Sequence, residues 1–107
     1  MSASRRYEIL LPLRFNDGQS VPDALISDTL IELENRFGAV SWETQIVRGH
    51  WRHEEEVYSD DLMRVIMDVE DIEEHRQFFR DFKEHLKTRF RQIEIYMTTH
   101  LIPSQSR

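Results

Sequence analysis

Hydrophobic and polar residues alternate along the first part of the chain. In residues 7–15, YEILLPLRF, every second position from Tyr7 to Phe15 is apolar. A two-residue period is typical of a strand with one buried face. Pro12 lies inside this stretch and has no backbone N–H, so we expect a bulge or a break in strand pairing there. The pattern predicts a strand whose odd-numbered residues face the core.

Two later segments, residues 20–37 and 71–90, carry apolar residues at helical spacing instead. The two apolar stripes are Ile26, Leu30, Leu33 and Phe37, and Phe79, Phe82, Leu86 and Phe90. Ser20 and Asp71 stand where a side chain could cap each helix, and Gly38 stands where a left-handed residue could end the first. The sequence therefore predicts two helices, each with one buried side.

Strand-like alternation returns between and after the predicted helices. It runs over residues 40–53 and 56–69, separated by a polar turn, and again over residues 93–101. The phase of the alternation slips near Gly49, which suggests a β-bulge. Two alternating runs joined by a short polar turn are typical of a β-hairpin. We therefore expect the two middle strands to be a hairpin and the last strand to follow the second helix.

The predicted order is strand, helix, strand, strand, helix, strand. It corresponds to an α+β fold of the ferredoxin-like, split βαβ (βαββαβ) type, with a four-stranded antiparallel sheet and two helices on one face. A chain of 107 residues has the length of one domain. We expect a single domain over residues 1–107, with flexible tails at 1–6 and 103–107.

Several stretches of the chain resemble a group of small bacterial proteins of unassigned function. They are YEILLPLRFNDG, RFGAVSWETQIVRGHWRHEEEVYSDD, and RVIMDVED followed by FFRDFKEHLKTRF. The resemblance covers nearly the whole length. It implies the same ferredoxin-like layout and supplies no catalytic residue.

The charge and the composition narrow the classes of function. A formal net charge of -6 argues against a dedicated nucleic-acid binder, which would present a basic face to phosphates. The chain has no cysteine, which excludes disulfides and thiolate metal sites. No run approaches the roughly 20 apolar residues of a membrane span. These observations favour a cytoplasmic protein that has no nucleic-acid or membrane partner and uses no cofactor.

The stretch GHWRHEEEVYSDD, residues 49–61, gathers histidines and carboxylates. His50, His53 and Glu55 are weak candidates for a metal site. Residues three apart on a strand point to opposite faces, so the two histidines would converge only if a bulge rotated one of them. The alternative is an exposed hairpin tip, held by packing between Trp51 and Tyr58 on the two strands.

The sheet face away from the predicted helices mixes apolar and charged residues. Its candidate interface residues are Leu10, Arg14, Leu62, Ile66 and Tyr96. A contiguous apolar patch on a surface usually marks association. We therefore expect a homodimer, or a module that binds another protein, with Arg14 and Arg64 paired to Glu8 and Asp68.

The same face also leaves an enzymatic alternative open. His100, Arg64, Tyr58 and Asp68 are the candidate catalytic residues, because together they could supply a base, an anion-binding group and hydrogen-bond partners. This alternative is a small cofactor-free enzyme with an acid–base or anion-binding pocket on the sheet face. The sequence does not decide whether the protein is an enzyme.

Overall fold

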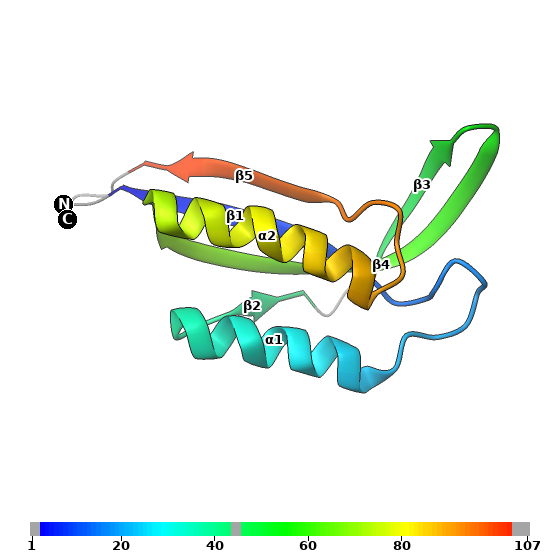
Figure 1. The fold of residues 1–107 in the computed structure, drawn as a ribbon, viewed down its shortest axis with the longest axis horizontal. Helices are drawn as coiled ribbons and strands as arrows, with labels where there is room; N and C mark the ends of the chain where they lie inside the picture. Colours follow the sequence, from blue (N-terminus) through cyan, green and yellow to red (C-terminus); the bar gives the residue numbers. More distant parts are fainter. Residues whose placement is uncertain (1–2, 44–45, 104–107) are drawn as a thin grey trace.

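The computed structural model describes residues 3–43 and 46–103; for residues 51 and 58–60 it describes the backbone only. Two helices pack against one antiparallel sheet, so the predicted α+β class is confirmed (Figure 1). The elements in chain order are β1 (Ser4–Pro12), α1 (Asp23–Phe37), β2 (Ser41–Trp42), β3 (Val47–His53), β4 (Glu56–Glu70), α2 (Glu73–Arg89) and β5 (Met97–Ile102).

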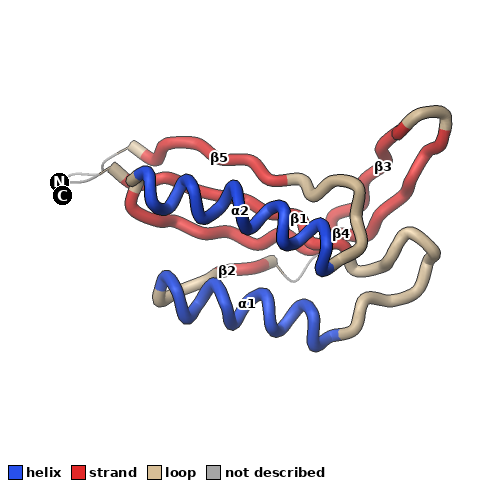
Figure 2. The backbone as a smooth tube through the Cα atoms, in the orientation of Figure 1, coloured by secondary structure: helices blue, strands red, loops and turns tan. Residues whose placement is uncertain are grey.

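The sheet has five strands rather than the four predicted. The strands follow the order β2-β4-β1-β5, and β3 pairs with the first part of the long strand β4. Every strand pair is antiparallel. The hairpin of β3 and β4 projects away from the helix-covered part of the sheet (Figure 2). The molecule is consequently elongated, with principal extents of 47 × 29 × 26 Å.

Both helices cover the same face of the sheet, as predicted (Figure 1). On β1, Tyr7, Ile9 and Leu11 point into the core, and the apolar stripe of α2 meets them. The rings of Tyr7 and Phe79 stack with their centroids 3.8 Å apart. Phe37 of α1 stacks on the same Phe79 ring, so both helices share one core. The predicted stripe of four residues on α2 is fully buried.

The two helices begin later than predicted, and neither predicted cap forms. Pro22 and Ile72 occupy the cap positions, and neither helix start has a side-chain cap. Ser20 instead forms an isolated bridge with Arg14. Asp71 turns its carboxylate to Arg5, whose Nε donates to it over 2.9 Å. The predicted end of α1 is confirmed, because Gly38 adopts a φ of 85° and its N–H donates to the carbonyl of Glu34.

The predicted strand over residues 40–53 is two strands. Residues 43–46 separate Trp42 from Val47, whereas only residues 63–64 separate their β4 partners, Val65 and Leu62. The two extra residues interrupt the pairing with β4 before Val47 and, being an even number, leave the alternation in phase. The predicted bulge at Gly49 is wrong, since the register of β3 on β4 is continuous from Val47 to His53.

The ends of the outer strands also differ from the prediction. β1 begins at Ser4, so residues 4–6 of the expected N-terminal tail are part of the sheet. β5 begins at Met97, and Ile93, which the alternation placed in the core, is exposed. Pro12 pairs with Leu62 as the last residue of β1, where no bulge is needed. Residues 1–2 and 104–107 of the expected tails lie outside the described residues.

Candidate functional site

The sheet face opposite the helices is the first candidate site. Along β1 the residues that alternate with the buried ones, Glu8 and Leu10, are only partly covered. Their neighbours across β4 are Ile66 and Arg64, and Thr98 of β5 lies opposite Glu8. Neither α1 nor α2 covers this face (Figure 1). It therefore presents apolar and charged side chains together, as the alternation predicted.

A hollow of about 170 Å³ marks one end of this open face. Its lining includes Leu10, Leu62 and Tyr96 of the predicted interface, with Glu94 beside them. The Leu10 N–H donates to the carbonyl of Tyr96 over 3.0 Å. This hydrogen bond extends the pairing with β1 to the residue directly before the start of β5. The Tyr96 side chain is 62% exposed. Apolar walls, a phenol and one carboxylate thus meet at the edge of the face.

At the other end of the face, Arg6 lies between Asp68 and His100 in the register of the three strands. Its guanidinium donates from Nε and Nη2 to the two carboxylate oxygens of Asp68, over 2.7 and 2.9 Å. These hydrogen bonds hold the pKa of the Asp68 carboxyl below its ordinary value. The Asp68 carboxylate is therefore charged and already paired with Arg6. The alternation pattern did not predict this role of Arg6.

Arg64 lies in the middle of the face, opposite Leu10. Its Nη1 donates to Glu43 over 3.2 Å. Its Nε is buried and has no hydrogen-bond partner among the described residues. A buried donor without an acceptor is costly, and native structures rarely keep one without a reason.

The candidate catalytic residues whose side chains are described are Arg64, Asp68 and His100, and they divide between two places on the face. Asp68 and Arg64 are four residues apart on β4, roughly 13 Å at the rise of a strand. His100 is exposed and belongs to the Arg6 end of the face. The side chain of Tyr58 lies outside the described residues, and its backbone belongs to the projecting hairpin. Within one chain, Arg64 therefore lies apart from Asp68 and His100.

Arg14 lies just beyond β1, at the base of the hairpin. It approaches Asp61 at 4.0 Å, and Nη1 donates to the carbonyl of Gly18 over 3.2 Å. Arg48 reaches the same Asp61 at 3.6 Å. Within the chain, Arg14 and Arg64 thus pair with Asp61 and Glu43, and the expected pairing with Glu8 and Asp68 does not occur.

The hairpin tip is exposed from Arg52 to Val57. Glu54 takes a positive φ of 57°, which closes the turn between His53 and Glu56. His50 pairs with Ser59 in the ladder, and His53 Nε2 lies 3.9 Å from Glu54. Across residues 3–43 and 46–103, no group of three or more histidines and carboxylates is placed to hold a metal ion. The backbones of Trp51 and Tyr58 are paired; the predicted packing of their side chains lies outside the described residues.

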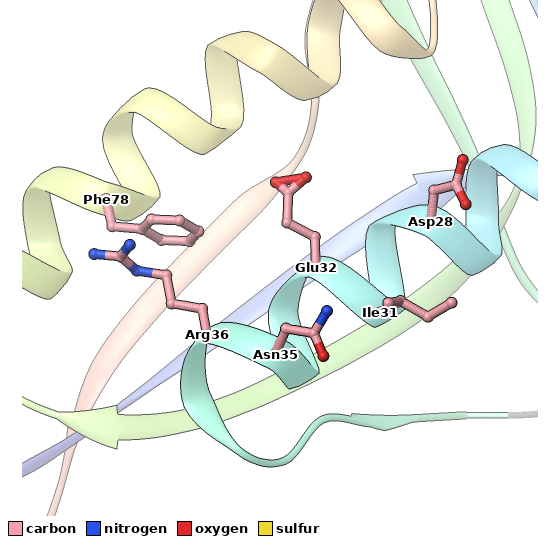
Figure 3. Close-up of a pocket in the computed structure, with 6 residues that line it drawn as sticks. All are labelled: Asp28, Ile31, Glu32, Asn35, Arg36 and Phe78. Carbon is pink, nitrogen blue, oxygen red and sulfur yellow. The ribbon is translucent and has the colours of Figure 1, made fainter.

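Another hollow, with a volume of about 600 Å³, lies between the outer sides of α1 and α2 (Figure 3). Two of its polar groups, Arg36 and Glu32, already have partners. The guanidinium of Arg36 lies over the Phe78 ring at 4.4 Å, and Glu32 accepts a hydrogen bond from Arg89 over 2.9 Å. Asn35 and Ile31 point outward rather than into a shared centre (Figure 3). We therefore treat this hollow as a surface groove and not as the functional site.

The chain is similar to solved structures over almost its whole length. A phage SAM lyase in complex with S-methyl-5'-thioadenosine matches with a TM-score of 0.71 and 11% identity, covering 97% of this chain and 92% of the lyase. The apo state of a phage SAM lyase matches at 0.63 with 13% identity, covering 98% of this chain and 93% of that one.

CutA1 from Oryza sativa also matches, with a TM-score of 0.60 and 12% identity, covering 98% of this chain and 84% of CutA1. No family model matches the chain. No curated protein matches it either. At these identities the likeness establishes a shared fold.

Neither α1 nor α2 has the length and hydrophobicity that a membrane-crossing helix requires, and they are the helices of the described residues.

Proposed function

We propose that the protein is a homo-oligomeric binding module whose open sheet face is covered by a second copy of the chain. The observation that carries this proposal is the mixture of half-buried Leu10, Leu62 and Ile66 with ion pairs on a sheet face that neither α1 nor α2 covers. An apolar patch over central strands is unusual for a monomer and is typical of an interface.

A second copy fits this face better than a partner of uniform charge. The face carries both signs, in the pairs Arg6 with Asp68 and Arg64 with Glu43. A two-fold axis brings one patch against itself, so a face of mixed charge can complement its own copy. The buried Nε of Arg64 would also gain an acceptor from such a partner.

Light scattering after size exclusion tests the proposal. We expect wild-type particles of at least two 13.0 kDa chains. Ile66→Arg places a charge within the face and should shift the particle toward a monomer. Ile31→Arg is the matched control, because Ile31 is 52% exposed on α1, on the helix side. A folded wild-type monomer at high concentration, or an equal shift in both variants, would overturn the proposal.

We also propose the detailed fold plan and the cellular location of the protein. We infer a ferredoxin-like plan in which the second strand is divided into β2 and β3. The strand order β5-β1-β4-β2 and the hairpin between β3 and β4 support it. One domain, a cytoplasmic location and a bacterial source also remain predictions from the sequence.

A second candidate function is an enzyme that acts on S-adenosylmethionine. The support is the match to the phage SAM lyase over nearly the full length of both chains, together with the hollow beside Tyr96. An aromatic ring and apolar walls suit an adenine, and Glu94, which also contacts Lys83 and Lys87, is the one acidic residue of the lining that could face a sulfonium. The catalytic set His100, Arg64, Tyr58 and Asp68 is less well supported, because Arg64 lies apart from Asp68 and His100 within the chain.

Incubation with S-adenosylmethionine tests this candidate. Chromatography should detect S-methyl-5'-thioadenosine above the level of a protein-free sample. Glu94→Gln should lower the rate at least tenfold, whereas Glu84→Gln, at an exposed position on α2, should not. The absence of product formation by a folded wild type would remove the candidate. An equal loss in both variants would remove the role of Glu94.

A further inference from the structure

A second hollow lies on the helix side of the sheet, between α2 and the strands β1 and β5. Its volume is about 190 Å³. Tyr7, Phe79 and Met97 give it an apolar lining, in which Tyr7 and Phe79 belong to the stacked pair of the core. A volume of this size corresponds to roughly six water molecules. It suits a small molecule or the end of a larger one.

Four of the other lining residues are positively charged. Arg5 comes from β1, and Arg76, Arg80 and Lys83 come from α2. None of the eight lining residues is acidic. In a chain whose formal net charge is -6, four cations around one hollow are a marked local reversal of sign.

The carboxylates that bind these cations hold them in place from outside the hollow. Asp71 contacts Arg5 at 2.9 Å and Arg76 at 3.4 Å. Glu73 contacts Arg76 at 3.2 Å and Arg80 at 2.6 Å. These carboxylates orient the guanidinium groups and do not line the hollow.

Lys83 is held in a similar way by Glu94, at 3.1 Å. Glu94 is shared, because Lys87 reaches it at 3.4 Å. Among the described residues, the four cations of the hollow therefore have three carboxylate partners, and one of these, Glu94, also binds a fifth cation, Lys87. The balance leaves excess positive charge at the hollow, and a guanidinium has more N–H donors than one carboxylate accepts.

The two hydroxyl groups in the lining, those of Thr99 and Tyr7, carry no charge. Nη1 of Arg5 donates to the Thr99 hydroxyl over 3.3 Å, and that hydroxyl donates to the carbonyl of Arg6 over 2.8 Å. Burial raises the pKa of the Tyr7 phenol, so Tyr7 keeps its proton at neutral pH. The base thus offers no negative charge to an incoming ligand.

We propose that this hollow binds a small anionic ligand, a phosphate monoester or a carboxylate with an apolar group. The anion lies among Arg5, Arg76, Arg80 and Lys83, and the apolar group lies against Phe79 and Met97. Arginine forks suit the planar or tetrahedral oxygens of such anions. The site is on the opposite side of the sheet from the proposed interface, so it does not depend on oligomerisation.

Calorimetric titration at low ionic strength with phenyl phosphate as the probe tests the site. We expect saturable binding of one phenyl phosphate per chain, at least tenfold tighter than that of phenol. The double variant Arg80→Gln with Lys83→Gln should weaken binding at least tenfold. Arg48→Gln with Arg52→Gln is the matched control, because it removes two exposed arginines from the distant hairpin. It should leave binding within about twofold of wild type.

Three outcomes would overturn the proposal, and one further measurement would support it. No binding by the folded wild type would show that the hollow is not an anion site. An equal loss in both double variants would mean that phenyl phosphate responds to net charge alone. Equal affinity for phenol would mean that only the apolar lining binds. Amide chemical-shift changes at Thr99 and Met97 in wild type, measured by NMR, would place the ligand independently of any variant.

Discussion

The two faces of the sheet belong to the same strands but differ in how far they are buried. On β1, Ile9 is fully buried beneath the helices, and the next residue, Leu10, remains partly exposed on the open face. Their partners on β4 repeat the contrast, since Val65 is buried and Arg64 carries an ion pair. One face is sealed within the chain, whereas the other needs a further molecule to be covered. The difference shows where this protein completes its fold and where, as we propose, a second copy covers it.

Truncation of adjacent residues on β1 should show the contrast most strongly. Ile9→Ala should lower the free energy of unfolding by about 2–5 kcal/mol, because it opens a cavity in a closed core. Leu10→Ala should cost less in the monomer, since solvent already reaches that site. Urea denaturation of both variants at a dilution that favours single chains checks this. Equal losses would mean that the two faces are equally well packed.

The sheet faces and helix stripes could be predicted because they depend on local periodicity. Alternation placed Tyr7, Ile9 and Leu11 in the core, and helical spacing placed Phe82 and Leu86 there. These patterns are set by the geometry of a strand or a helix, whatever the rest of the chain does. These core residues could therefore be predicted from short segments of the sequence.

The helix starts could not be predicted, because long-range partners compete for the capping side chains. Asp71 is bound by Arg5, which lies 66 positions earlier in the chain. The positively charged hollow was missed for the same reason. Arg5 and Arg80 meet only once β1 lies beside α2. Local pattern carries no information on such a meeting.

The projecting hairpin should respond weakly to changes at its tip. Replacing His53, Glu54 and Glu55 together by serine should change the free energy of unfolding by less than about 1 kcal/mol, because the tip is exposed. Trp51→Ala should cost more than that, because Trp51 pairs with Tyr58 across the two strands. Thermal unfolding of both variants checks the difference. Loss of an activity or of a bound metal in the triple variant would instead make the hairpin the site.

Acidification should affect the open face through Asp68. Its folded-state pKa is lowered, so its contribution to stability is complete above the pKa of the unfolded chain and is lost as the pH falls through the folded pKa. Stability should therefore decline below about pH 4, near the ordinary pKa of an aspartate. Asp68→Asn should make that decline shallower, with an effect smaller than that of Ile9→Ala. An unchanged acid profile, followed by circular dichroism, would show that the Arg6 pair contributes nothing.

The distance between two copies of the open face is the most direct test of the central claim. The chain has no cysteine, so Thr98→Cys on the open face and Asn35→Cys on α1 each carry a single spin label. Pulsed electron resonance should give a defined distance between copies at Thr98→Cys that is shorter than at Asn35→Cys. An absence of dipolar coupling at Thr98→Cys, or a longer distance there than at Asn35→Cys, would contradict the claim that a second copy covers this face.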